Sequence, residues 1–200
     1  MLWDPANPAG SPISGQPNGD DFNTPQHKNF AAYVQAAHDA VKAVSPDICT
    51  VVHVDKGNQE YPAKWIFNIL KYYNVDYDMI GLSLYPTQNS GYTKTKLISG
   101  YVQPAINNAK ALTAAFSKPV IFAEVGMPWD DPDGGAQLIQ TIMNAAKTDN
   151  NLRGIFYWEP EANPRWEAEG NGTNGYPMGA FNPQTNSPTG ALTPFLTNIN

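Results

Sequence analysis

The chain has 200 residues, a length typical of one domain with a substantial core. Apolar residues account for 42% and charged residues for 15%, and the 18 prolines and 16 glycines indicate many ordered loops between apolar segments. The net charge of −6 and the pI near 4.9 come without a basic patch, which argues against a nucleic-acid partner and leaves neutral or cationic ligands open.

Three absences narrow the class of protein further. The only cysteine, Cys49, excludes an internal disulfide and a zinc site built on a C-x-x-C motif. No apolar run reaches the roughly 18 residues that a membrane span needs, so no membrane partner is predicted. The opening residues, MLWDPANPAGS, lack the basic and apolar regions of a signal peptide.

The first part of the chain predicts a loop, a helix and a strand. Residues 1–24 are rich in Pro, Gly, Asn and Asp and predict a loop. Thr24 followed by Pro25 is typical of a helix start, and Pro46 ends the helix. Its apolar stripe comprises Phe30, Tyr33, Val34, Ala37, Val41 and Val44. The β-branched run TVVHVD, residues 50–55, predicts the first strand.

Helices and strands continue to alternate after this strand. The next helix has the stripe Trp65, Ile66, Ile69, Leu70 and Tyr73, and a later one has Leu138, Ile139, Ile142, Met143 and Ala146. Residues 93–117 predict a helix broken or kinked at Pro104. The remaining predicted strands are MIGLSLYP (79–86), PVIFAEVG (119–126) and GIFYWEP (154–160), before a loop-rich tail.

The alternation indicates an α/β fold with a parallel sheet. The strands are nearly continuous apolar runs, as in a parallel sheet that is covered on both faces. A doubly wound sheet and a (β/α) barrel both fit this order. No G-x-G-x-x-G or Walker motif follows a strand, which weakens the nucleotide-binding, doubly wound alternative.

Polar or aromatic residues occur at the carboxyl end of every predicted strand, where barrel enzymes carry their chemistry. They are His53 and Asp55, then Ser83 and Tyr85, then Glu124 with Trp129, then Trp158 and Glu159. Each has a structural alternative. His53 and Trp158 could be core residues, Asp55 a turn cap, Tyr85 a simple strand end, and Glu124 half of a buried ion pair. No Lys or Arg lies in the strands that would flank Glu124.

Carboxylates and indoles at strand ends, without a phosphate loop, favour carbohydrate chemistry. Glycosidic hydrolysis uses two carboxyl groups, which retaining enzymes hold about 5–5.5 Å apart. Flat indoles pack on the apolar faces of sugar rings, which gives a function to Trp129, Trp158 and Trp166. For Trp166 the alternative is an indole that stabilises its own loop.

Four segments in this order, HVDKG, DYDMIGLSLYP, KPVIFAEVGMPW and GIFYWEP, resemble glycoside hydrolase family 53, the arabinogalactan endo-β-1,4-galactanases. The opening MLWDP is similar to the stretch after that family's fourth strand. The resemblance covers most of the chain and implies a retaining (β/α)8 TIM barrel that is secreted or periplasmic. It implies that Glu124 is the nucleophile. The sugar subsites would be lined by His53, Asp55, Ser83, Tyr85, Trp129 and Trp158.

Two departures from the family pattern shape the expectation. In the family the acid/base glutamate lies in a G-N-E motif shortly before the element that here is Met1–Trp3. We therefore expect residues 1–200 to form one partial catalytic domain of about four βα units, the C-terminal half of the barrel with strands five to eight. The segment YPTQNS (85–90) replaces an aromatic-rich stretch, which leaves the exact polysaccharide open.

The chain offers few candidates for a second carboxylate. Glu159 is adjacent to Trp158, but side chains alternate along a strand, so an inward Trp158 would turn Glu159 toward the helices. Glu60 and Glu161 fall in predicted loops. The segment DDPDGG, with Asp130, Asp131 and Asp133, has oxygen ligands that would suit a structural calcium ion, although a solvated turn explains it more simply. No cofactor is otherwise predicted.

The sequence thus predicts a fragment of a retaining endo-β-1,4-galactanase that hydrolyses galactan, a polysaccharide partner. Another retaining barrel glycosidase, a mannanase or endoglucanase, is the alternative enzyme, and a non-catalytic carbohydrate-binding remnant is the alternative outside enzymes. Four strands in place of eight would leave sheet edges and apolar side chains uncovered. We therefore expect the 200-residue chain by itself to be marginally stable, to dimerise through its open edges or to aggregate. We also expect it to be inactive, because it lacks the acid/base glutamate.

Overall fold

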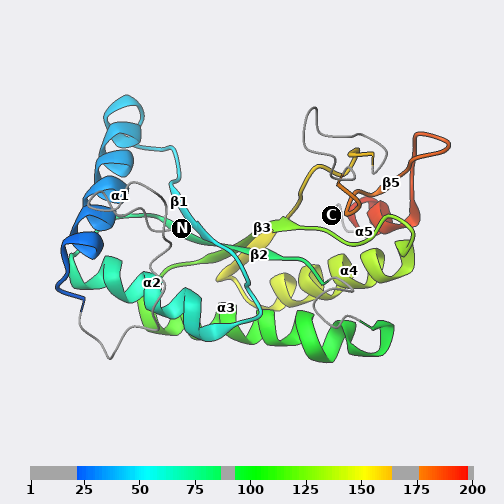
Figure 1. Cartoon of the computed structure of the whole chain (residues 1–200), viewed down its shortest axis with the longest axis horizontal. Coiled ribbons are helices and arrows are strands. Elements are labelled where there is room, and N and C mark those ends of the chain that lie inside the picture. The colour runs from blue at the N-terminus through cyan, green and yellow to red at the C-terminus, as the bar shows by residue number, and fades with distance from the viewer. Residues whose placement is uncertain (1–21, 87–92, 164–175, 198–200) are drawn as a thin grey trace. The chain divides into compact units, whose positions relative to one another are not determined.

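The computed structural model describes residues 22–86, 93–163 and 176–197 (Figure 1). The chain forms two compact units, one from Met1–Val52 and Tyr61–Met79 and the other from His53–Glu60 and Ile80–Asn200. The predicted N-terminal loop up to residue 21, most of the YPTQNS segment and Trp166 lie outside the described residues.

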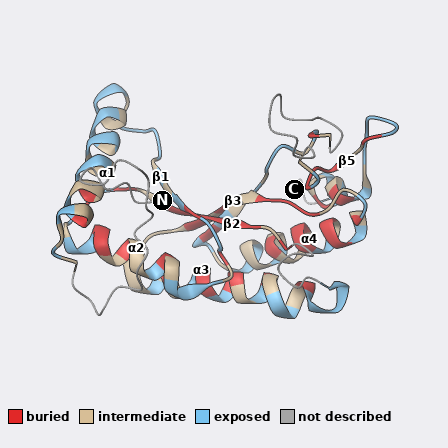
Figure 2. Ribbon diagram, in the orientation of Figure 1, coloured by how far each residue is buried: buried red, intermediate tan, exposed pale blue. Residues whose placement is uncertain are grey.

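Helix α1 (Pro25–Val44) lies in the first unit and begins and ends where its caps predict. The Thr24 hydroxyl accepts a hydrogen bond from His27 N at 3.2 Å, and the helix stops before Pro46. The predicted helix is confirmed, but its apolar stripe is not buried. Only His27 and Ala31 of this helix are buried, and the His27 ring packs edge-on against Trp65. Figure 2 shows the rest of α1 as exposed or intermediate.

Helix α2 (Glu60–Tyr72), which belongs to the first unit except for its first residue, supplies most of that unit's core. Its buried residues are Ala63, Phe67, Ile69 and Leu70, so the predicted stripe was correct at Ile69 and Leu70 and missed Phe67. The Phe67 ring packs on Tyr77 with centroids 5.7 Å apart. Burial raises the pKa of Tyr77 to about 12, as expected for a phenol whose ionised form would lose its hydration.

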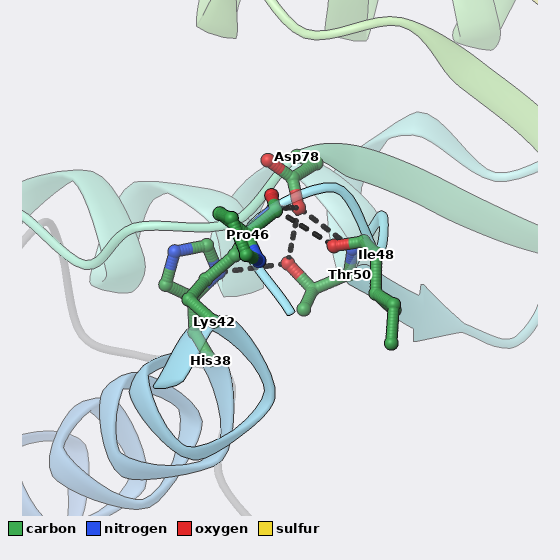
Figure 3. A network of polar contacts seen from close by, with 6 residues as sticks. All are labelled: His38, Lys42, Pro46, Ile48, Thr50 and Asp78. Carbon is green, nitrogen blue, oxygen red and sulfur yellow. Dashed lines mark hydrogen bonds and ion pairs between the residues drawn. The ribbon is translucent and has the colours of Figure 1, made fainter. Parts of the chain in front are cut away.

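A polar network fixes the segments that lead into the first two strands (Figure 3). Asp78 Oδ2 accepts hydrogen bonds from Thr50 N at 2.7 Å and Thr50 Oγ1 at 2.8 Å, and pairs with Lys42 Nζ at 2.9 Å. Lys42 Nζ also donates to the carbonyl oxygens of Pro46 and Ile48. The hydrogen bond from Thr50 N, then Lys42, holds the pKa of Asp78 well below its usual range.

The sheet has the strand order β1-β2-β3-β4, the order in which the strands occur along the chain. The strands are β1 (Val51–Val54), β2 (Met79–Leu84), β3 (Val120–Val125) and β4 (Leu152–Tyr157). The β2–β3 and β3–β4 pairs are parallel, which confirms the predicted α/β fold with a parallel sheet. A doubly wound sheet reverses its strand order at a switch point, and these four strands show no such reversal.

Two long helices of the second unit, α3 (Gln103–Phe116) and α4 (Pro132–Thr148), lie on the same side of β3 in Figure 1. The predicted interruption at Pro104 is confirmed. A 3₁₀ turn η2 (Lys94–Lys96) and a π-helical segment η3 (Leu97–Val102) precede α3, which has Pro104 in its first turn. Proline fits there because first-turn N–H groups have no partner within the helix.

The tail contains more regular structure than the sequence predicts. Short strands β5 (Phe181–Asn182) and β6 (Ser187–Pro188) pair antiparallel, and η4 (Gly190–Leu192) leads into helix α5 (Thr193–Thr197). Ala191 is buried against α4, where a Cβ on Gly135 would lie 2.8 Å from the Ala191 Cβ. Two-residue strands and single turns carry no periodic pattern, which explains why they were missed.

Burial is uneven across the sheet. Strand β2 is largely buried (Figure 2), with Met79 as its one residue of intermediate exposure. Phe156 in β4, by contrast, is 59% exposed. The fourth strand also begins two residues earlier than predicted and ends before Trp158.

None of the helices in the described part of the chain combines the length and the apolar character that a membrane crossing requires.

Candidate active site

A β-bulge brings Glu124 out of the buried face of the sheet. Leu82 pairs with Phe122, but the next residue, Ser83, pairs with Glu124, so Ala123 is an extra residue in β3. Neighbouring residues of β2 point to opposite faces, and paired residues share a face. Phe122 therefore lies on the fully buried side with Leu82, and Glu124 lies with Ser83 on the other side. The bulge explains how a carboxylate is tolerated in this apolar run.

Three predicted residues surround the Glu124 carboxylate. Its Oε2 accepts hydrogen bonds from Ser83 Oγ at 3.2 Å and from Tyr85 Oη at 3.1 Å. Its Oε1 lies 3.8 Å from His53 Nδ1, beyond hydrogen-bond distance. The other ring nitrogen of His53, Nε2, lies 2.7 Å from Ser83 Oγ. The structure thus brings His53, Ser83, Tyr85 and Glu124 into one cluster.

The cluster is not the buried Lys or Arg ion pair that was the structural alternative for Glu124. Within the described residues His53 is the only basic side chain paired with it, and neither side chain is fully buried, with 32% of His53 and 26% of Glu124 exposed. Ser83 is only 4% exposed. Because both hydroxyls donate to Oε2, no hydrogen bond between described residues occupies Oε1, and the Glu124 side chain as a whole is partly exposed.

Tyr85 is held in place by Tyr176 and Gly126. Burial, then the neighbouring Tyr176 hydroxyl, then the charge of Glu124 raise the pKa of Tyr85. A Cβ on Gly126 would lie 2.6 Å from Tyr85 Cε1 and 2.8 Å from Tyr176 Oη. Only a residue without a side chain leaves room for both rings, so the absence of a Cβ at Gly126 allows Tyr85 and Tyr176 to pack where they do.

Tyr157 anchors the segment that carries Tyr176. Its hydroxyl accepts a hydrogen bond from Met127 N at 3.1 Å and lies 3.1 Å from Met178 O, to which it can donate. Burial raises the pKa of Tyr157 to about 12. The last residue of β4 thereby joins the segment after β3 to residues 176–180.

Asp55 and Tyr85 line a pocket of about 510 Å³. Its other lining residues are Lys56, Asn58, Gln59, Gly100 and Tyr101. The loop from β1 is fixed there, because Gly57 N donates to Ser83 O at 2.7 Å and Asn108 Nδ2 donates to Gly57 O at 2.8 Å. Asp55 Oδ1 accepts from Lys56 N, so the turn-cap alternative is correct and the residue also faces a pocket.

Trp129 and Trp158 follow β3 and β4 within a few residues, and no hydrogen bond between described residues joins either of them to the cluster. Trp158 follows β4, and its side chain is 46% exposed. Its backbone N–H donates to Val125 O at 2.9 Å. Trp158 is therefore not a core residue. Trp129 is half-buried, and its backbone N–H donates to Pro177 O at 3.1 Å.

The sequence argument about Glu159 was wrong in its premise. Trp158 and Glu159 lie beyond the end of β4, and Glu159 has a left-handed φ of 42°, so strand alternation does not fix its direction. The charges of Glu159 and Glu124 both raise the pKa of Tyr176, after burial, which is the largest cause. Glu60 starts α2, and Glu161 borders a separate pocket near β5, in a turn as predicted.

The aspartate-rich segment serves α4. Asp131, 8% exposed, caps the helix by accepting from Gly134 N at 3.2 Å, and its Oδ1 lies 3.1 Å from Lys94 Nζ. Among the described residues no three His, Cys, Asp or Glu side chains group as metal ligands would. The calcium expectation gains no support from Asp130 and Asp133.

Sequence reasoning missed Tyr176, Gly126 and Tyr101. Tyr176 follows a Gly- and Asn-rich stretch without periodicity, and its place depends on contacts with distant strands. Gly126 had a usable signal, because a glycine directly after a strand often marks a close approach of other atoms.

Comparison with known proteins identifies the family of the chain. The family model described as Glycosyl hydrolase family 53 matches residues 10–195. An arabinogalactan endo-β-1,4-galactanase of Humicola insolens is 26% identical over 155 residues, covering 66% of this chain and 44% of its own length. One from Cellvibrio japonicus is 28% identical over 151 residues, covering 64% and 36%. Both relatives are more than twice as long as the segment that matches.

A search of solved structures also finds a galactanase. A solved structure of a fungal β-1,4-galactanase superimposes with a TM-score of 0.65 at 21% identity, covering 86% of this chain and 55% of that one. At 21% identity the superposition shows that the two chains share a fold and nothing more. The family match, by contrast, covers nearly all of the sequence. The chain belongs to glycosyl hydrolase family 53.

Proposed function

We propose that the chain carries the nucleophile side of a retaining endo-β-1,4-galactanase, with Glu124 as the nucleophile. The observation that supports this most directly is the Glu124 carboxylate at the end of β3. Two hydroxyl donors hold its Oε2, and within the part of the chain that the structure describes Oε1 accepts no hydrogen bond. The galactanase names of its relatives supply the substrate class. Parallel strands in sequential order support an assignment of residues 1–200 to half of a (β/α)8 barrel.

In the proposed reaction Glu124 Oε1 attacks the anomeric carbon and displaces the leaving oxygen, which gives a covalent glycosyl-enzyme. A general acid protonates the leaving oxygen and then, as a base, activates the water that releases the sugar. The family resemblance gives this role to a glutamate in a G-N-E motif, which these 200 residues do not contain. Ser83 and Tyr85 would hold Oε2 throughout and so keep the attacking oxygen in place.

The sugar-binding residues follow from the same proposal. Asp55, Tyr85 and Tyr101 would bind a sugar in the 510 Å³ pocket, through hydrogen bonds to its hydroxyls and contact with its ring. The exposed indole of Trp158 and the half-buried Trp129 would stack on neighbouring sugars. Secretion or export to the periplasm belongs to this proposal, because polymeric galactan is an extracellular substrate.

The experiment uses an activated inhibitor, because a very good leaving group needs no protonation by a general acid. The 200-residue chain is incubated with a 2,4-dinitrophenyl 2-deoxy-2-fluoro β-1,4-galactobioside, and the labelled peptide is identified by mass spectrometry. We expect one label on Glu124, none in Glu124→Gln, and slower labelling by the gluco- and manno-configured reagents. Galactan affinity electrophoresis of both proteins provides the binding control.

The possible outcomes separate the alternatives. Faster labelling by the manno- or gluco-configured reagent would replace galactanase with mannanase or endoglucanase. Binding of galactan without any label would favour a non-catalytic carbohydrate-binding protein. Labelling of Glu159 would move the nucleophile to that residue. Absence of both label and binding would overturn the proposal for this chain.

A further inference from the structure

We propose that His53 and Ser83 are positioning residues for Glu124 that form a hydrogen-bonded chain with a fixed proton order. In this chain His53 Nε2–H donates to Ser83 Oγ, and the Ser83 hydroxyl donates to Glu124 Oε2. The proton order stands on the geometry, and its effect on glycosyl transfer rests on the proposed function of Glu124.

The proton order follows from counting donors and acceptors. Ser83 has one hydroxyl hydrogen and, among the described residues, two close polar neighbours, Glu124 Oε2 at 3.2 Å and His53 Nε2 at 2.7 Å. An ionised carboxylate can only accept, so the hydroxyl hydrogen points to Glu124. The contact at 2.7 Å then requires a hydrogen on His53 Nε2. A ring with Nδ1–H alone would place two lone pairs against each other at this distance.

The same proton order leaves the attacking oxygen free. With its hydrogen on Nε2, the neutral His53 ring has only a lone pair on Nδ1, which faces Glu124 Oε1 at 3.8 Å. A lone pair at that distance cannot hold Oε1 through a hydrogen bond. Oε2 is thus held by hydrogen bonds, and Oε1 remains available to attack the anomeric carbon, as a carboxylate nucleophile requires.

Ser83 is well placed to transmit this order. It is 4% exposed and lies opposite Glu124 because of the bulge at Ala123. Its carbonyl oxygen accepts a hydrogen bond from Gly57 N at 2.7 Å, so the backbone on which the hydroxyl rotates is fixed as well. A buried hydroxyl on a rigid strand has few rotamers, so its two contacts are maintained together.

The first-unit network contains a natural comparison for the same rule. His38 Nδ1 lies 2.8 Å from Thr50 Oγ1, and that hydroxyl donates to Asp78 Oδ2 (Figure 3). By the same count His38 carries its hydrogen on Nδ1. The two histidines should therefore show opposite tautomers in one protein, which gives the experiment an internal reference.

The test is a long-range ¹H–¹⁵N correlation spectrum of the intact 200-residue chain above neutral pH. The chain has only 3 histidines, so the ring signals can be assigned by single substitutions. We expect the Nε2–H tautomer for His53 and the Nδ1–H tautomer for His38. Ser83→Ala should leave His53 in a mixture of tautomers, and Ser83→Thr, which keeps the hydroxyl, should restore Nε2–H.

A second variant and a rate complete the test. Glu124→Ala removes the acceptor, so Ser83 becomes free to donate to His53, and the His53 tautomers should mix while His38 stays unchanged. Labelling of Glu124 by the fluorinated galactobioside should slow roughly 10- to 100-fold in Ser83→Ala, as expected for a lost hydrogen bond to a charged group, and recover in Ser83→Thr.

Each result bears on one claim only. An Nδ1–H or mixed tautomer for His53 in the unaltered chain would overturn the proton order, and so would a tautomer that does not respond to Ser83→Ala. The expected tautomers in the unaltered chain, with Glu124 labelled equally fast in Ser83→Ala and in the unaltered chain, would overturn the positioning role. Failure of labelling in the unaltered chain, with the expected tautomers, would count against the proposed function and leave the proton order supported.

Discussion

Replacing Gly126 by alanine should distort the cluster around Glu124 without removing any of its polar groups. The added Cβ would lie 2.6 Å from Tyr85 Cε1, 3.0 Å from Tyr85 Cδ1 and 2.8 Å from Tyr176 Oη. Ordinary contact begins near 3.4 Å, so the Tyr85 ring has to move by about 0.8 Å. Both rings are partly buried, so they cannot simply swing into solvent.

The displacement is large compared with the hydrogen bond that it strains. Tyr85 Oη lies 3.1 Å from Glu124 Oε2, and a shift of about 0.8 Å would take the pair beyond hydrogen-bond distance if the ring moves away from Glu124. Overpacking costs about 1–3 kcal/mol. A lost hydrogen bond to a carboxylate adds about 1.5–3 kcal/mol when the site is buried, and less here because Glu124 is 26% exposed. We expect the free energy of unfolding to fall by about 2–4 kcal/mol.

Urea unfolding of the chain measures this loss, and Gly190→Ala is the matched control. No atom lies within 4 Å of a Cβ built on Gly190, so that variant should be neutral or slightly stabilising. In a Tyr85→Phe background the hydrogen bond is already absent, so Gly126→Ala should cost less than in the unaltered chain. Equal unfolding free energies for Gly126→Ala and Gly190→Ala, or strictly additive effects with Tyr85→Phe, would refute the reasoning.

Three further predictions concern other parts of the chain. The pKa of Asp78 is lower in the folded state than in the unfolded state, so Asp78 stabilises the protein above its unfolded pKa of about 4 and loses that contribution as the pH falls further. Asp78→Asn should therefore make the free energy of unfolding depend less on pH between about pH 5 and 2. An unchanged pH dependence would contradict this. Asn108→Ala should lower the free energy of unfolding by about 1–3 kcal/mol and speed amide exchange at Gly57, whose carbonyl loses its buried donor; protection equal to that of the unaltered chain would count against it. Phe156→Ser should reduce self-association in analytical ultracentrifugation, since Phe156 is 59% exposed, and unchanged sedimentation would place the contact elsewhere.

Much of the local structure could be predicted because its causes are local. The start of α1 at Thr24–Pro25, the four strands and the break before Pro104 all follow from capping groups, β-branched runs and the missing proline N–H. Which face of a helix is buried is a different matter, as α1 shows. Its regular apolar stripe leaves Tyr33 59% and Val44 84% exposed, because periodicity reports an available face and cannot supply the surface that covers it.

The sequence by itself determined which side chains could do chemistry: a carboxylate at Glu124 in an apolar strand, with His53, Ser83 and Tyr85 at the ends of other strands. Only the tertiary structure decided how they meet. The bulge at Ala123 turned Glu124 toward Ser83, and strand alternation alone would have placed it with Phe122. Register between strands, and the contacts of segments such as the one carrying Tyr176, depend on residues far apart along the chain, so no local pattern encodes them.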